Sequence, residues 1–100
     1  MIYLVVVILE ILMKRDYEDK RYEKFRRDVR KRDNHTCQWP NCGATRKLKV
    51  HHICKWTTNY FMRYEVSNGI VLCRKCHDAI SGLEEAYAPL FHHIVRENSK

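Results

Sequence analysis

Four cysteines form two short pairs, Cys37 with Cys42 and Cys73 with Cys76, and thirty residues separate the pairs. Zinc binds four thiolates in a tetrahedron, and a turn that carries two closely spaced cysteines presents both sulfurs to one side of an ion. Two such turns join distant parts of the chain, so the free energy of metal binding becomes folding free energy. We therefore expect this cysteine quartet to hold a structural zinc ion, with two disulfides or unrelated buried thiols as the alternatives. Cys54 stands alone and is assigned to no metal.

Three histidines near the cysteine quartet could do chemistry. His51 and His52 are adjacent at the end of an expected strand, where neighbouring side chains point to opposite faces. One of them could therefore face a metal ion and the other a substrate if the strand bends. His77 directly follows Cys76, so closure of a zinc site would fix its position. A lone histidine is usually structural or exposed, but this combination indicates a functional site.

Larger motifs surround these histidines. The string VHHI at residues 50–53 is followed by Trp56 and by NGIVLCRKCH at residues 68–77, and together they resemble the HNH nuclease family. The cysteine-bearing branch of that family, common among phages, is the most similar. CQWPNC at residues 37–42 and the preceding Arg32-Asp33 resemble the same branch, so the likeness covers about residues 24–83. The cysteine quartet matches the structural zinc set of this branch.

The resemblance implies a role for each motif residue. His52 matches the general base that activates water, and His51 and His77 match protein ligands of a catalytic divalent ion, which could be Mg²⁺, Mn²⁺, Ni²⁺ or Zn²⁺. Asn68 matches the residue that orients the base and stiffens the loop, although Asn-Gly taken alone is a turn signal. Several relatives carry a further histidine one turn after the last motif histidine. Ser81 stands there in this chain, which leaves a third protein ligand unidentified.

The resemblance also implies a fold and an activity. The expected fold is a small α+β domain with a ββα-metal (His-Me finger) core, a structural zinc site and flanking helices. The expected activity is that of a metal-dependent DNA endonuclease, which hydrolyses phosphodiester bonds by nicking or by double-strand cleavage. Neutral imidazole accepts a proton from water at neutral pH, and a divalent ion stabilises charge on phosphate, so the chemistry agrees. The alternative is a non-catalytic, zinc-stabilised module that binds nucleic acid, with the histidines as relics.

A basic amphipathic segment precedes the cysteine quartet. Apolar side chains recur at three- and four-residue spacing, which predicts a helix over residues 16–32. The segment 14–32 holds ten of the nineteen lysines and arginines, so it is either a solvated surface or a phosphate-binding one. We expect DNA contacts above all from the basic residues of its second half: Arg26, Arg27, Arg30, Lys31 and Arg32.

The remaining elements are expected to place the histidines around a hairpin. Alternating apolar residues predict a strand over residues 48–53, and a short apolar run predicts a second strand over 69–72. An irregular loop rich in aromatic residues, 54–67, should connect them. Two helices should follow, over about 76–82 and 83–97, with the second broken or kinked at Pro89.

Length and charge limit the organisation of the chain. One hundred residues suit a single domain, which we place at 13–100. The apolar segment 1–12 is shorter than the roughly 20 residues of a membrane span. We therefore expect it to be either a packed strand or an upstream extension. It has no secretory features, so we expect a protein of the cytoplasm in a bacterial or phage-infected cell, where thiols stay reduced.

The net charge of +7 is typical of a domain with a polyanionic partner, either nucleic acid or an anionic membrane surface, and solubility alone is the alternative explanation. We expect DNA and no membrane. A homodimer would explain double-strand cuts, and a larger phage or bacterial protein is a further candidate partner.

Overall fold

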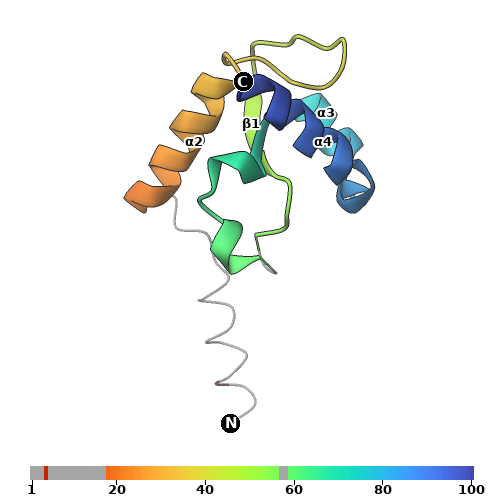
Figure 1. Ribbon diagram of the computed structural model, residues 1–100. Helices are drawn as coiled ribbons and strands as arrows, with labels where there is room; N and C mark the ends of the chain where they lie inside the picture. The colour runs from red at the N-terminus through yellow and green to blue at the C-terminus, as the bar shows by residue number, and fades with distance from the viewer. Residues whose placement is uncertain (1–3, 5–17, 57–58) are drawn as a thin grey trace.

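The computed structural model describes Leu4 and residues 18–56 and 59–100 (Figure 1). Apart from Leu4, the apolar segment 1–12 lies outside the described residues, as do positions 16 and 17 of the expected first helix. The described elements are α2 (Lys20–Arg32), β1 (Leu48–His52), η1 (Tyr60–Met62), η2 (Val66–Asn68), β2 (Gly69–Cys73), α3 (Arg74–Ala79) and α4 (Glu84–Asn98). No helix in this part of the chain is both long and apolar enough to cross a membrane.

A two-stranded antiparallel sheet lies at the centre of the molecule, between α2 and the α3–α4 pair (Figure 1). β1 and β2 pair along their whole lengths, with Leu48 opposite Cys73 and His52 opposite Gly69. β2 is buried at every position and continues directly into α3. The expected small α+β fold with a ββα core and flanking helices is therefore confirmed.

The two faces of β2 supply two apolar clusters, because successive side chains of a strand point to opposite sides. Val71 packs with Phe25 and Val29 of α2. Its neighbours Ile70 and Leu72 belong to the cluster that α4 completes on the other side of the sheet. The hairpin is thus held between two helices, and this fixes the strand that carries the histidines.

Helix α2 buries the apolar stripe that its spacing predicts: Tyr22, Phe25 and Val29. It begins at Lys20, later than the expected position 16. The Asp19 side chain accepts a hydrogen bond from the Arg21 backbone N–H at 2.8 Å, and this cap satisfies one of the N–H groups that a helix start leaves without a partner.

The two C-terminal helices also differ from the expected boundaries. α3 begins at Arg74, two residues early, because the Cys73 sulfur accepts the Cys76 N–H at 3.5 Å and caps the helix. α4 runs through Pro89 without a break, so the predicted break is wrong. Proline removes one backbone hydrogen bond, but the helix is anchored beyond it where Phe91 and Val95 pack in the core.

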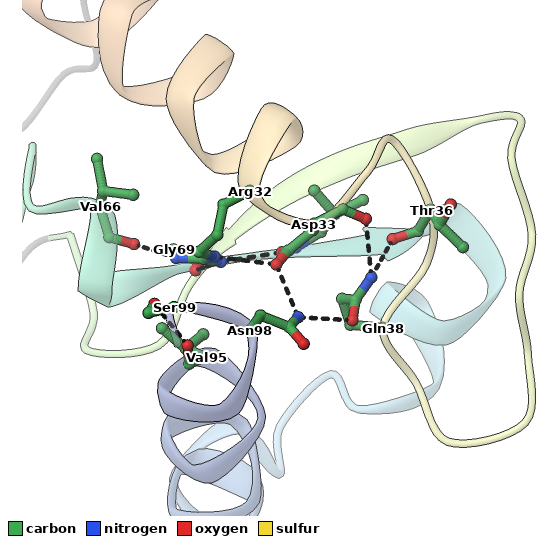
Figure 2. A network of polar contacts seen from close by, with 10 residues as sticks. Arg32, Asp33, Thr36, Gln38, Val66, Gly69, Val95, Asn98 and Ser99 are labelled. Atoms are coloured by element: carbon green, nitrogen blue, oxygen red, sulfur yellow. Dashed lines mark hydrogen bonds and ion pairs between the residues drawn. The ribbon is translucent and has the colours of Figure 1, made fainter.

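A polar network joins the C-terminal ends of α2 and α4 to β2 (Figure 2). The Asp33 carboxylate is completely buried and accepts the Val71 backbone N–H at 2.9 Å. It also accepts a hydrogen bond from Asn98 Nδ2 at 3.0 Å, and that amide reaches Gln38 Oε1 at 2.8 Å. One carboxylate therefore ties two helices and a strand together.

Arg32 belongs to this network (Figure 2). Its guanidinium donates to both oxygens of Asp33 at 2.9 Å and to the carbonyls of Val66 and Gly69 at 2.7 and 2.6 Å. Only 10% of the side chain is exposed. The expected phosphate contact of Arg32 stays a prediction, and the buried carboxylate at the end of the helix turns this arginine inward.

Candidate active site and metal centres

The cysteine quartet converges as its spacing predicts. Cys37 and Cys42 lie on the loop after α2, Cys73 ends β2, and Cys76 lies on α3. The four sulfur atoms all lie within 4.8 Å of one another, and all five cysteines are free thiols. The alternative of two disulfides is therefore wrong, and the cluster is compatible with a structural zinc site.

The local electrostatics favour a cation at the cysteine quartet. The Cys76 backbone N–H lowers the pKa of Cys73 to about 7, which favours the thiolate that zinc binds. Burial, together with the neighbouring sulfurs, raises the pKa of Cys76. Four ionised thiols at this spacing would repel one another, and a divalent cation among them would remove that penalty.

His51 and His77 face each other from β1 and α3. Their ring centroids are 5.5 Å apart and their planes meet at 77°. His51 is buried, whereas 36% of the His77 side chain is exposed. Two imidazoles that share a tetrahedral ion, with metal–nitrogen distances of about 2.0–2.1 Å, have ring centres roughly 5 Å apart. The pair therefore fits a divalent ion, and it lines a cavity of about 280 Å³ that gives access to it.

His52 lines the same cavity from the end of β1. Its ring stacks on Phe25 of α2 with centroids 4.8 Å apart, and its Nε2 lies 2.9 Å from the Arg63 carbonyl oxygen. A carbonyl oxygen only accepts, so Nε2 carries the proton in this contact, and in neutral imidazole the lone pair is then on Nδ1. The stacking and the hydrogen bond fix both the plane of the ring and its tautomer.

Asn68 is completely buried and clamps the loop between the strands. Its side-chain oxygen accepts the Cys54 N–H at 2.8 Å, and its amide donates to the carbonyls of Cys54 and Met62 at 3.2 and 3.1 Å. These bonds fix both sides of the loop that presents the Arg63 carbonyl to His52. Asn68 therefore reaches the histidine through the loop, and it is more than a turn residue.

Arg63 is a site residue that the sequence analysis missed. Its guanidinium lies over the rings of Trp56 and Tyr60, at 4.5 and 5.1 Å from their centroids, and its Nε donates to the Trp56 carbonyl at 2.7 Å. Arg63 is 8% exposed, and these contacts hold its side chain in place within the loop. An arginine within a run of aromatic residues is the signal that could have identified it, because cations pack on aromatic faces.

Glu84, the first residue of α4, was missed as well. It lines the cavity of His51, His52 and His77. Its own backbone N–H and that of Gly82 lower the pKa of its carboxyl group, with smaller contributions from Lys55 and His51. The carboxylate is therefore ionised at neutral pH. No motif marks it, because it reaches the cavity only through the turn between α3 and α4.

The five basic residues of α2 that are expected to contact DNA divide into three groups. Arg26 and Arg30 line a second cavity of about 250 Å³, together with Lys49, and this cavity shares Val50 and His77 with the first. A cationic groove therefore adjoins the histidines. Exposed positions of α2 hold two more of the expected contacts, Arg27 and Lys31, whereas Arg32 is turned inward.

The comparison with protein families now bears on this geometry. The family model described as HNH endonuclease matches residues 37–82. All four cysteines, both strands and the motif residues from His51 to His77 lie inside the match, so the family resemblance is confirmed. No curated protein and no solved structure matches the chain. Residues 37–82 are therefore similar to an HNH endonuclease domain, and this match suggests a nuclease or nucleic-acid-binding function.

Proposed function

We propose that this HNH domain is a metal-dependent DNA endonuclease in which His52 is the general base. The observation that carries the proposal is the contact between His52 Nε2 and the Arg63 carbonyl oxygen at 2.9 Å. With the proton on Nε2, Nδ1 is the nitrogen that we propose to accept a proton, and His52 lines the same cavity as His51 and His77. A relic domain would have no need to hold one imidazole in a single tautomer.

In the proposed reaction, Nδ1 of His52 takes a proton from the water that attacks phosphorus. A bond forms from the water oxygen to phosphorus, and the bond from phosphorus to the 3′ oxygen breaks. The 3′ oxygen takes a proton from solvent water, which leaves a 5′ phosphate and a 3′ hydroxyl. The Arg63 carbonyl stabilises the imidazolium that results, because its hydrogen bond becomes charge-assisted. Phe25 keeps the ring in plane, and Asn68 keeps the loop in place.

His51 and His77 are the residues that would hold the catalytic ion. When bound, a divalent ion supplies positive charge beside the phosphate and the departing oxygen. Mg²⁺, Mn²⁺, Ni²⁺ and Zn²⁺ all remain candidates. The cysteine quartet would have a separate task, since it would hold a structural zinc that fixes α3, and with it His77, against the hairpin.

The DNA backbone is proposed to lie along the cationic groove next to the histidines. Arg26, Arg30 and Lys49 line that groove, and Arg27 and Lys31 lie exposed on the same helix as Arg26. Contacts of this kind fix the register of the duplex but carry no sequence information. Binding should therefore weaken steeply with salt and depend little on sequence. A homodimer would bring two sites to opposite strands.

Incubation with supercoiled plasmid in Mg²⁺, Mn²⁺, Ni²⁺ or Zn²⁺ tests the proposal, with nicked and linear products separated on a gel. His52→Ala should lower the cleavage rate about 10²- to 10⁴-fold, the usual contribution of a general base. His93→Ala, on the exposed side of α4, should leave the rate unchanged. Full activity of His52→Ala would contradict the mechanism. Salt-dependent DNA binding without cleavage in any of these metals would favour the non-catalytic module.

A further inference from the structure

We infer that the carboxylate of Glu84 is the third protein ligand of the ion held by His51 and His77. The inference rests on the proposed function, because it concerns the ion of that site. It assigns a role to a residue outside the HNH motif and outside the matched region 37–82.

The turn between α3 and α4 brings Glu84 to the site. Gly82 has a positive φ of 84°, a conformation that glycine adopts without strain, and α4 starts two residues later beside α3 (Figure 1). Glu84 consequently lines the cavity that His51 and His77 also line. The first turn of α4 and His77 of α3 therefore line the same cavity.

The chemistry of the cavity leaves a place for a carboxylate. Among the residues that the structure describes, Glu84 is the only acidic one that lines it, and Lys55 is the only other charged one besides the histidines. Two imidazoles and a glutamate form an established donor set for catalytic zinc, and oxygen ligands suit Mg²⁺ and Mn²⁺ better than imidazole does. Without Glu84, the protein would offer a divalent ion two neutral ligands and no compensating charge.

The position at which several relatives carry another histidine cannot serve here. Ser81 occupies it, and α3 ends at Ala79, so this residue no longer continues the helical face of His77. Among the described residues, the cysteine quartet is the only group of three or more Cys, His, Asp or Glu side chains whose donor atoms already lie close together. Glu84 must therefore reach the ion by rotating its half-buried side chain.

A glutamate at the start of a helix also stabilises the helix, because the N-terminus carries partial positive charge. Glu85 separates this effect from metal binding. It lies in the same first turn and carries the same charge. Its side chain is 89% exposed, lies 4.0 Å from Lys55, and does not line the cavity of the histidines. Glu85→Gln is therefore a matched control for Glu84→Gln.

The test is a titration of the zinc-loaded full chain with Mn²⁺, followed by electron paramagnetic resonance of the free ion. Mn²⁺ is chosen because it prefers oxygen and imidazole to thiolate and so spares the cysteine quartet. Wild type should bind one Mn²⁺, and His77→Ala should lose it. Glu84→Gln should weaken binding by at least about tenfold, the low end of what even outer partners of a metal contribute. Glu85→Gln should stay within about twofold of wild type.

Equal Mn²⁺ affinity of Glu84→Gln and Glu85→Gln would overturn the inference. Plasmid nicking by the same preparations in Mn²⁺ shows which proposal has failed. If wild type nicks, His52→Ala does not, and Glu84→Gln binds Mn²⁺ as tightly as wild type, only the assignment of Glu84 is wrong. If wild type neither binds Mn²⁺ nor nicks DNA in any metal, the proposed function is wrong, and the assignment is wrong with it.

Discussion

The guanidinium of Arg32 and the carboxylate of Asp33 form a buried ion pair. Their other hydrogen bonds go to the backbone of β2 and of the turn before it, and to the side-chain amide of Asn98. Arg21 and Arg27 of the same helix are exposed, whereas the buried Asp33 carboxylate and two backbone carbonyls hold Arg32 inward. A buried pair is a weak source of net stability, but the removal of one member leaves the other charged and desolvated. At the scale of single residues, the role of an arginine thus depends on whether it is buried with a charged partner.

Arg32→Ala should therefore lower the free energy of unfolding by about 3–5 kcal/mol, because the Asp33 carboxylate stays buried without its partner. Arg27→Ala, at an exposed position of the same helix, should change it by no more than about 0.5 kcal/mol. Urea unfolding of the zinc-loaded proteins, followed by circular dichroism, measures both. A loss of under about 1 kcal/mol for Arg32→Ala would show that water replaces the missing guanidinium.

At the scale of elements, the active site depends on how closely α2 approaches the hairpin. The contact is made at Gly69, where a Cβ atom would lie 2.6 Å from Val29 Cγ2 and 2.7 Å from Phe25 Cζ. Phe25 also stacks on His52, so the same packing that holds α2 to β2 positions the proposed base. The helix therefore supports the proposed base as well as carrying the residues proposed to bind DNA.

Gly69→Ala should destabilise the fold by about 1–3 kcal/mol, as overpacking of a core usually does. It should also lower the rate of plasmid nicking, because a displaced Phe25 no longer holds the His52 ring. Ser67→Ala, exposed just before the same strand, should change neither quantity. Chemical denaturation and the nicking assay give the two values. Wild-type activity in Gly69→Ala would mean that the stacking contact is not needed.

At the scale of the whole molecule, the cysteine quartet supplements a thin core. A domain of about 100 residues buries a limited apolar surface, and the two apolar clusters here lie on opposite faces of only two strands. Zinc at the quartet would fasten the loop at 37–42 to β2 and α3 at one point. The position of His77 would then depend on a metal that takes no part in the reaction.

Removal of zinc by a strong chelator should lower the melting temperature and abolish the fixed arrangement of α3, since metal-binding free energy is folding free energy. Cys76→Ser should mimic this loss, with less than one zinc per chain by elemental analysis. Cys54→Ser is the matched control and should keep one zinc and the wild-type melting temperature, because Cys54 lies outside the cluster. An unchanged zinc content in Cys76→Ser would contradict the assignment.

The sequence by itself determined everything that is encoded at short range. Spacing predicted the cysteine quartet, the apolar stripe of α2 and the two strands, because helical and strand periodicities are local properties of the backbone. The resemblance to the HNH family gave a role to each motif residue, and these residues lie inside the matched region. Boundaries were less accurate, because caps such as the Cys73 sulfur depend on side-chain geometry.

Only the tertiary structure decided which side chains share a space. Arg32 bonds to carbonyls 34 and 37 residues away, and Arg63 presents its carbonyl to a histidine eleven residues back. Glu84 meets the histidines through a turn that no motif marks. Such contacts depend on how the helices pack on the hairpin, which single-sequence periodicity does not encode. The sequence thus predicted the chemistry of this site, and the fold decided which neighbours orient and complete it.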